Sequence, residues 1–273
     1  MKNRAGRFIS YLFLIISSII SVFPFYWMFV ISTNTTAEAN KFPPKIIPGD
    51  QFIANLQNAW ENADFITALF NTLIVAGTIT ISQLFFCSLA AFALARLQFK
   101  GRNFVFMLIV STLLLPPVSP IPLYIIVSKF DWINSLYAVI IPFLVGAFGV
   151  FLMKQFIETA IHPELIESAK MDGARNFQTY YRIVLPILKP GLATLAIITF
   201  MAIWNDFVWP SIVLKDQSVQ TLQLAVRGLQ NAYNRDTALI VTGAFITTLP
   251  LLAIFIPFSR QFISGLTEGS VKG

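Results

Sequence analysis

The chain is poor in charge and in the residues that most enzyme chemistry uses. Charged residues make up 12% of its 273 residues, about half the share in soluble domains. Cys87 is the one cysteine and His162 the one histidine, which excludes an intrachain disulfide and a cluster of such metal ligands. The sequence also lacks a Gly-x-x-x-x-Gly-Lys-Ser/Thr phosphate-binding loop. We therefore predict no catalytic residue, no metal and no cofactor held by this chain.

Apolar residues, in contrast, make up 56% of the chain, and the mean hydropathy is +0.72. They gather in long runs, which is typical of helices that cross a bilayer in about 20 residues. We predict an all-α integral membrane protein with six transmembrane helices. The predicted spans are 8–31, 68–94, 104–127, 133–157, 188–210 and 238–258.

The third predicted span is interrupted by prolines. Pro116, Pro117, Pro120 and Pro122 fall within it, and such a group must bend or break a helix and leave carbonyls that neighbours or water must satisfy. A kinked helix that lines a pathway, a membrane re-entry and a simple kink are all compatible with this pattern.

The runs divide the chain into three parts. We predict an N-terminal transmembrane helix with an external connection at 1–67, a domain of five helices at 68–258, and a cytoplasmic tail at 259–273. With the N-terminus inside, thirteen of the nineteen Lys and Arg residues fall in inner segments, as the positive-inside rule requires. We therefore expect both termini in the cytoplasm, and we attribute the net positive charge to membrane topology rather than to nucleic-acid binding.

A charged segment, 163–190, lies between the fourth and fifth spans. Pro163 suits the first position of a helix, and Glu164 and Glu167 favour the positive end of the helix dipole. Gly173 can supply the left-handed residue that ends this helix. The segment predicts a capped surface helix, which serves either as a handle for a partner protein or only as an interfacial loop.

A second short helix is predicted after this glycine. Asn176 is a candidate N-cap, and Pro186 should end the helix because proline disfavours helical geometry in the residue before it. One apolar helix face is expected from i, i+3, i+4, i+7 spacing. The residues of that face are Phe177, Tyr180, Tyr181, Val184 and Leu185.

The two helices resemble the "EAA" loop of bacterial ABC importer permeases. The pattern of that family is Glu-Ala-Ala, two residues, Asp-Gly-Ala, and a downstream Ile-x-Leu-Pro. This chain matches it with Ser168 in place of the middle alanine. The matching residues are Glu167-Ser168-Ala169, Asp172-Gly173-Ala174, Ile183, Leu185-Pro186 and Pro190.

The resemblance implies the type-I ABC importer permease fold, with 158–186, here called the docking loop, placed against a cytoplasmic ATPase. It implies a second homologous permease subunit, two ATPase subunits that bind ATP and Mg²⁺, and an extracytoplasmic sugar-binding protein. The complex would lie in the inner or plasma membrane of a bacterium. The implied ATPase-docking residues are Glu164, Glu167, Ser168, Ala169, Asp172, Gly173 and Ala174.

Two further stretches are similar to the maltose-type, carbohydrate-importing branch, and to the shorter, six-span permease of its pair. They are Trp204-Asn205-Asp206-Phe207 and the tail 265–273. The resemblance implies carbohydrate import by alternating access, and the alternative cargo is a glycerol phosphate-type or other polyol solute. It also implies tail contacts to the ATPases. The tail residues concerned are Gly269, Val271, Lys272 and Gly273.

Asp206 is the most informative charge in a predicted span. A carboxylate at a helix centre costs about 2.5–3.5 kcal/mol on insertion scales and less near an end. Trp204, Asn205 and Asp206 either face the translocation pathway or belong to the aromatic belt at the interface. The rival functions are a stand-alone secondary transporter, although its internal repeats and broken midplane helices are not evident, and a membrane scaffold that transports nothing.

Overall fold

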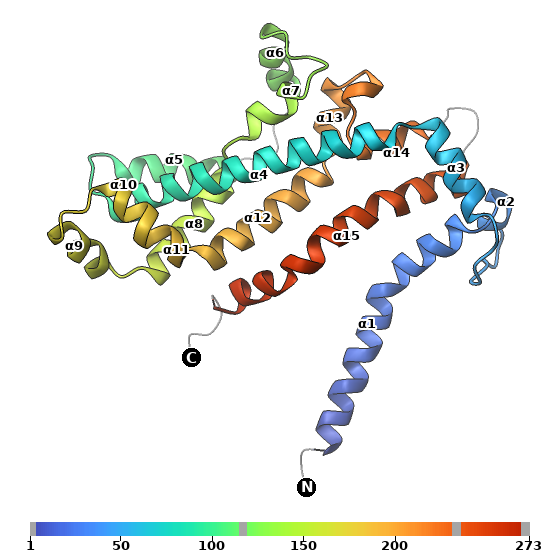
Figure 1. The fold of residues 1–273 in the computed structure, drawn as a ribbon, viewed down its shortest axis with the longest axis horizontal. Helices are drawn as coiled ribbons and strands as arrows, with labels where there is room; N and C mark the ends of the chain where they lie inside the picture. The colour runs from blue at the N-terminus through green and yellow to red at the C-terminus, as the bar shows by residue number, and fades with distance from the viewer. Residues whose placement is uncertain (1–3, 115–118, 231–235, 269–273) are drawn as a thin grey trace. The chain divides into compact units, whose positions relative to one another are not determined.

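The computed structural model describes residues 4–114, 119–230 and 236–268, and side chains within 6–114, 119–230 and 236–256 (Figure 1). Every regular element in these ranges is helical. The chain divides into two compact units, which we describe separately. Unit 1 comprises Met1–Phe65 and Leu224–Leu251, and unit 2 comprises Ile66–Gln223 and Leu252–Gly273.

Five helical segments in the described residues are long and apolar enough to cross a membrane. They correspond to all the predicted spans except the third, because a run of about 20 apolar residues is itself sufficient for a spanning helix. The segments are Gly6–Ser32, Phe65–Arg96, Tyr137–Ala160, Lys189–Val213 and Thr237–Ile256.

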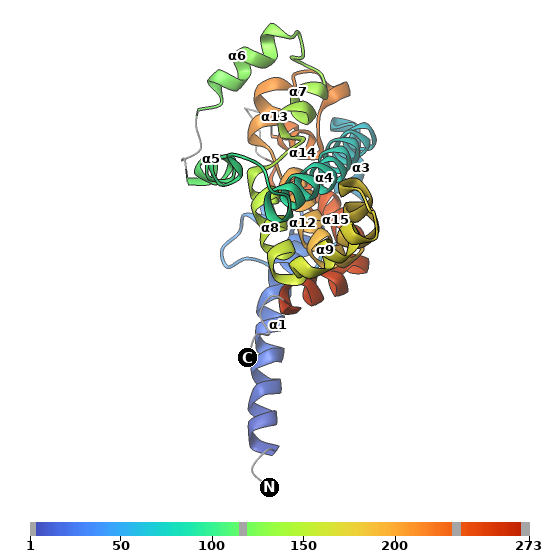
Figure 2. The same cartoon turned by 90° about the vertical axis from the view of Figure 1, so that its left-hand side faces the viewer.

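The third predicted span is divided into two helices. Helix α5 (Arg102–Leu114) has 13 residues, about 20 Å at 1.5 Å per residue, and is therefore shorter than a bilayer core. Helix α6 (Ile121–Lys129) begins where Pro120 is its N-cap and Pro122 lies in its first turn. In Figure 2, α5 is seen end-on while α6 runs across the view. These two prolines start a new helix rather than kink a continuous one, and Pro116 and Pro117 lie outside the described residues.

The fourth and fifth spans are each made of more than one helix, and the fourth begins and ends later than predicted. The fourth starts at α7 (Tyr137–Ile140), because Asp131 and Asn134 have φ of +55° and +61° and so form a turn. It continues through η1 (Ile141–Phe143) to α8 (Ala147–Ala160). The fifth ends its first helix early: α12 (Lys189–Trp204) is followed by a separate α13 (Val208–Val213).

Unit 1 contains α1 (Arg4–Ser32), α2 (Thr36–Ala39) and α3 (Phe52–Asn62). Phe29 packs against Phe52 and Phe245, with ring centroids 6.0 and 5.7 Å away. Phe245 belongs to α15 (Thr237–Glu268), whose helical backbone runs past the end predicted at 258. The Asp236 carboxylate accepts the backbone N–H of Leu239 at 2.9 Å, which caps the start of α15.

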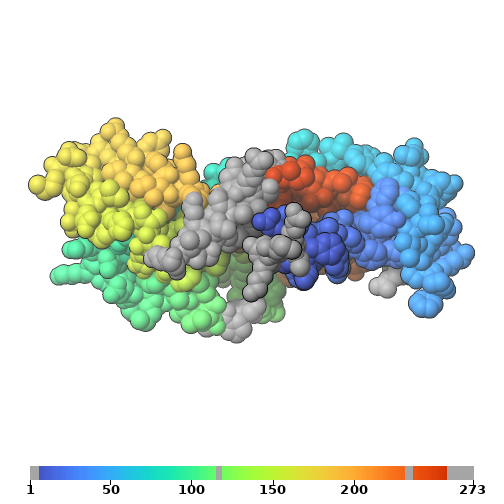
Figure 3. Space-filling model, turned by 90° about the horizontal axis from the view of Figure 1, so that it is seen from below, coloured from blue at the N-terminus to red at the C-terminus, as the bar shows by residue number. Residues whose placement is uncertain are grey.

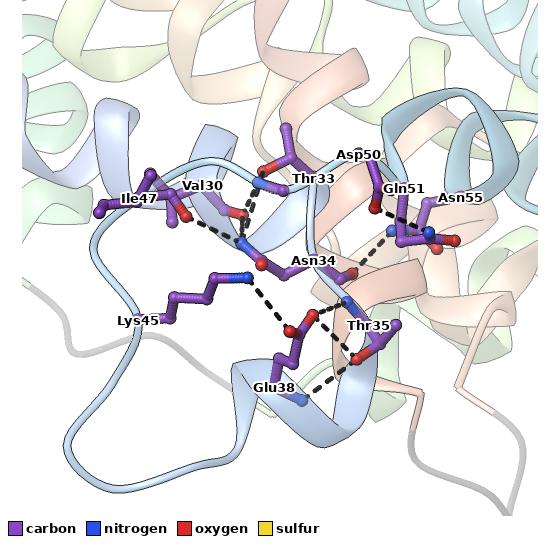
Figure 4. A network of polar contacts seen from close by, with 11 residues as sticks. Val30, Thr33, Asn34, Thr35, Glu38, Lys45, Ile47, Asp50, Gln51 and Asn55 are labelled. Atoms are coloured by element: carbon purple, nitrogen blue, oxygen red, sulfur yellow. Dashed lines mark hydrogen bonds and ion pairs between the residues drawn. The ribbon is translucent and has the colours of Figure 1, made fainter.

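A polar network holds the connection after α1 in place (Figure 4). The Thr33 hydroxyl accepts the Gly49 N–H at 2.8 Å, and the Asn55 amide donates to the carbonyls of Ser32 and Asn34. Lys45 donates to Glu38 at 3.1 Å, and this bond lowers the pKa of the Glu38 carboxyl. These side chains fasten the turn that returns the chain from α1 to α3.

Unit 2 is built around α4 (Phe65–Arg96), with α8 and α12 packed against it (Figure 1). Its buried core joins Cys87, Ala91 and Met153 with the far end of the docking loop. A Cβ at Gly149 would lie 2.8 Å from the Cys87 sulfur, and one at Gly191 would lie 2.8 Å from the Phe156 ring. Close approach of these helices therefore depends on residues without side chains.

At the other end of α4, amide and hydroxyl groups bind the segment before α14 (Leu222–Gly228). The Asn71 amide donates to the carbonyls of Ser218 and Gln220, and the Thr72 hydroxyl accepts the Leu222 N–H at 2.9 Å. Unit 2 therefore has its docking loop at one end of α4 and this polar anchorage at the opposite end.

Candidate functional site

The first helix of the docking loop forms as predicted. Helix α9 (Pro163–Met171) starts after His162, whose extended backbone (φ −71°, ψ 143°) makes it the N-cap. Pro163 occupies the first turn, where its missing N–H leaves no bond unmade. Glu164 lies in this first turn and Lys170 in the last, so both charges complement the helix dipole.

Gly173 ends α9 in a Schellman motif. Its φ is +80°, its N–H donates to the carbonyl of Lys170 at 3.0 Å, and the N–H of Ala174 donates to that of Ala169 at 2.9 Å. These two bonds satisfy carbonyls that the end of a helix otherwise leaves free. The chain then turns back toward the core of unit 2.

We expect Gly173→Val to destabilise the end of α9 while Gly173→Asn keeps it. A Cβ at this position meets no atom within 4 Å, so the cost comes from the left-handed backbone. That cost is about 1–2 kcal/mol for most residues and least for asparagine. The measurement is the thermal unfolding temperature of the purified protein. Equal unfolding temperatures for these two variants would show that the turn does not depend on this backbone conformation.

Helix α9 buries one face and exposes its charges. Ile166 and Ala169 are 4% and 6% exposed, and they join the core of unit 2. The predicted docking residues Glu164, Glu167, Ser168, Asp172 and Gly173 are exposed, and Ala174 is half-buried. Ala169 is therefore part of the attachment of α9 rather than of its outer surface. Figure 3 shows the docking loop, in yellow and light orange, at the surface of the molecule.

The second half of the docking loop departs from the prediction. Arg175, not Asn176, is the N-cap of α10 (Asn176–Thr179), and its backbone N–H donates to the Gln178 side chain at 2.9 Å. A π-helical turn, η2 (Tyr180–Val184), and α11 (Leu185–Ile187) follow.

Pro186 does not end the helical path, contrary to prediction. The Leu185 N–H bonds to the carbonyl of Tyr180, five residues back, and the Leu188 N–H bonds to that of Val184 at 3.0 Å. The wider π turn accommodates a proline that lacks an N–H and would crowd a regular helix.

The structure divides the predicted apolar face into a buried and an exposed part. Tyr180 and Val184 are 2% and 0% exposed, whereas Phe177 and Tyr181 are 61% and 64% exposed. Only the first two residues therefore pack into the core of unit 2. The hydroxyls of Tyr180 and Ser88 lie 2.7 Å apart. This buried hydrogen bond attaches the second half of the docking loop to α4.

Arg96 is a residue whose role the sequence did not reveal. From the last turn of α4, its guanidinium donates to the carbonyls of Ile157 at 3.1 Å, Glu158 at 3.4 Å and Ile161. Helix α8 has no basic residue in its own last turn, so Arg96 supplies the positive charge that favours a helix C-terminus. This contact fixes the chain where it enters α9. The only sequence signal was a basic residue at the end of a long apolar run.

Trp204, Asn205 and Asp206 lie at the break between α12 and α13. Trp204 is 1% exposed, while Asn205 is exposed and its side chain donates to the carbonyl of Met201 at 2.8 Å. The half-buried Asp206 carboxylate faces the backbone N–H groups of Val208 and Trp209, at the start of α13. The geometry therefore gives Asp206 a structural role in starting α13. Asn205 is the more exposed of these two polar side chains.

We expect Asp206→Asn to keep protein stability and Asp206→Ala to lower it by about 1 kcal/mol, the usual cost of losing an N-terminal capping group. The measurement is thermal unfolding of the purified protein, with Asn205→Ala as the neighbouring control. If Asp206→Asn lowered the unfolding temperature as much as Asp206→Ala, the negative charge itself would be needed to start α13.

Two further predictions concern the C-terminal tail and metal binding. Gly269, Val271, Lys272 and Gly273 of the tail lie outside the described residues. Within the described ranges, no three His, Cys, Asp or Glu side chains are grouped in a way that could hold a metal ion.

Comparisons with known proteins match this chain over most or all of its length. The family described as "Binding-protein-dependent transport system inner membrane component" matches residues 1–262. The melibiose/raffinose/stachyose import permease protein MelC of Bacillus subtilis is 35% identical over 254 residues, 92% of this chain and 91% of that protein. The arabinooligosaccharides transport system permease protein AraQ of Halalkalibacterium halodurans is 31% identical over 283 aligned residues, all of both proteins. The sn-glycerol-3-phosphate transport system permease protein UgpE of Salmonella typhi is 30% identical, over 98% of this chain and 99% of that protein.

A solved structure has a similar fold. It is a bacterial ABC transporter involved in the import of the acidic polysaccharide alginate, and one of its chains gives a TM-score of 0.78 with 21% identity. The match covers 95% of this chain and 97% of that one. At this identity the likeness concerns the fold alone.

Proposed function

Since this chain belongs to the family of binding-protein-dependent transport system inner membrane components, we propose that it is a membrane-spanning permease subunit that imports a carbohydrate by alternating access, driven by partner ATPases. The type-I importer permease fold predicted from the sequence agrees with the family and with the similar structure. The relatives named above as permeases for melibiose, raffinose and stachyose and for arabinooligosaccharides favour a sugar as the cargo.

The observation that carries the proposal is the presentation of α9. Its carboxylates are exposed, its two ends are capped, and its inner face is held in the core of unit 2 by Ile166 and Ala169. A short rigid helix of this kind suits a groove on a partner protein. Because the chain just before α9 is attached to α4 through Arg96, and the chain after it through Tyr180, a partner that moves α9 also moves a spanning helix.

The remaining parts of the proposal follow from this role. A second homologous permease completes the pathway, two ATPases bind ATP and Mg²⁺, and an extracytoplasmic binding protein delivers the cargo. Both termini and the docking loop then face the cytoplasm. Closure of the ATPases on ATP would draw the docked loops together, which is coupling between two sites through one bistable element.

The proposal is tested by purifying the chain with its partners and measuring uptake in proteoliposomes. We expect an ATPase to co-purify and uptake to require both ATP and the binding protein. Uptake that continues without ATP would support a stand-alone transporter instead, and a complex that never transports would support a scaffold.

A glycerol phosphate-type cargo is the second candidate, favoured by the likeness to UgpE. Specificity in such systems would reside largely in the binding protein, so the deciding measurement is calorimetric titration of that protein. A sugar ligand is expected, and binding of glycerol phosphate alone would replace the first candidate by the second.

A further inference from the structure

The two halves of the docking loop and its exit carry opposite charge. Helix α9 and its cap expose three carboxylates, Glu164, Glu167 and Asp172, against one cation, Lys170. From 173 to 205 no Asp or Glu occurs, and the charged residues are Arg175, Arg182 and Lys189, seven residues apart. All three are exposed. The ion pairs formed within the described parts of the chain, Lys45 with Glu38 and Lys154 with Glu158, include none of them.

Exposed aromatic rings accompany these cations. Phe177 and Tyr181 are 61% and 64% exposed on the same helical path, which continues from α10 through η2 and α11 into the apolar helix α12. Basic and aromatic side chains that flank the end of a spanning helix are characteristic of the membrane–water interface. Arg182 and Lys189 are thus placed where a spanning segment begins.

An apolar groove lies beside Lys189. It has a volume of about 250 Å³ and runs between α8 and the start of α12. Leu152, Phe156 and Ala160 line it on the α8 side, and Ile187 and Pro190 line it on the other. Its lining is mainly hydrocarbon, with Gln155 and Thr159 as polar members, and Lys189 lies between the lining residues Leu188 and Pro190 in the chain.

We propose that Arg182, Lys189 and this groove form a binding site for an anionic phospholipid of the cytoplasmic leaflet, here called the lipid site. The phosphate pairs with the two cations, and part of one acyl chain occupies the groove. The proposal rests on the proposed function for one point, that the docking loop faces the cytoplasm, where anionic lipids attract basic segments.

Charge distinguishes this occupant from a protein partner. The acidic outer surface of α9 suits a basic groove on an ATPase, whereas the lipid site presents only positive charge beside hydrocarbon. A bound lipid would hold the second half of the docking loop at the bilayer surface and leave α9 free to engage its partner.

The test compares lipid retention by the purified importer. The complex is exposed to mixed micelles of dioleoyl phosphatidylglycerol and dioleoyl phosphatidylcholine, and bound lipid is counted by native mass spectrometry. Each basic residue near an anionic surface contributes about fivefold in affinity, so Arg182→Gln with Lys189→Gln should weaken phosphatidylglycerol retention roughly 25- to 30-fold. The matched control, Lys100→Gln with Arg102→Gln, removes the same charge from the connection between α4 and α5 and should retain the lipid.

A third variant tests the groove. Ala160→Phe adds bulk without changing charge, and it should lower the retention of both lipids. Equal phosphatidylglycerol retention by the wild type and the Arg182/Lys189 variant would overturn the lipid site. Loss of the ATPases from that variant with lipid retention unchanged would overturn it too, and would assign the cations to a protein contact. ATP-driven uptake by the wild type tests the proposed function separately, because it does not depend on which lipid is retained.

Discussion

Glu167→Lys is expected to abolish co-purification of the ATPases and ATP-driven uptake while leaving the amount of chain in the membrane unchanged. Glu167 is exposed on α9, and the two ion pairs found in the described residues do not involve it. A lysine there would face a basic partner surface, and like charges brought together at an interface cost several kcal/mol. A loss of only about 1.4 kcal/mol of binding free energy already weakens the affinity about tenfold. We therefore expect ATPase recovery to fall by more than about tenfold.

The control is the same glutamate-to-lysine substitution on a different helix. Glu61 is exposed on α3, in the connection that we predict to be extracytoplasmic, so Glu61→Lys should leave ATPase recovery unchanged. Retention of the ATPases by Glu167→Lys would show that α9 is not the docking surface. Loss of the ATPases from both variants would show that general charge, rather than this helix, controls assembly.

Arg96→Leu is expected to give the largest loss of stability. The substitution removes the guanidinium donor from the carbonyls of Ile157, Glu158 and Ile161, of which Ile157 keeps the backbone N–H of Ile161, and it removes the positive charge at the C-terminus of α8. Loss of hydrogen bonds to a charged group costs about 2–3 kcal/mol, which lowers the unfolding temperature of a chain this size by roughly 5–10 °C. Thermal unfolding of the detergent-purified protein measures this shift.

The same substitution should also weaken the coupling of ATP hydrolysis to uptake. With the entry to α9 no longer tied to α4, ATP hydrolysis should continue without proportionate uptake in the fraction that remains folded. Arg102→Leu is the matched control, because Arg102 makes one longer bond, 3.4 Å, to the carbonyl of Leu97. Similar unfolding temperatures for the two variants would contradict the special role of Arg96.

Prediction from the sequence was most successful where the determining interactions are local. The start of α9 depends on Pro163, its end depends on Gly173, and neither requires contact with distant residues. The spanning helices 8–31 and 68–94 were found for the same reason, since an uninterrupted apolar run decides them. The assignment of docking, tail and pathway roles to individual residues stays a prediction, to be decided by the variants described above.

Prediction failed where distant parts of the chain determine local geometry. Phe177 and Tyr181 were predicted to share one apolar face with Tyr180 and Val184, but the core buries only the latter two, which belong to the π turn. Pro186 was expected to end a helix that the same turn allows to continue. The third span was predicted to be bent or broken by its prolines, and only the structure decides that Pro120 and Pro122 begin a separate helix.

The sequence by itself determined that this chain is a helical membrane protein with a capped, glycine-terminated surface helix between two apolar runs, because composition, helix length and capping are properties of neighbouring residues. Only the tertiary structure decided how that helix is fastened. Arg96 meets carbonyls 61 to 65 positions along the chain, and Ser88 meets Tyr180 across 92. No local pattern specifies such pairs, because they arise when α4, α8 and the docking loop pack together and their polar groups must find partners away from water.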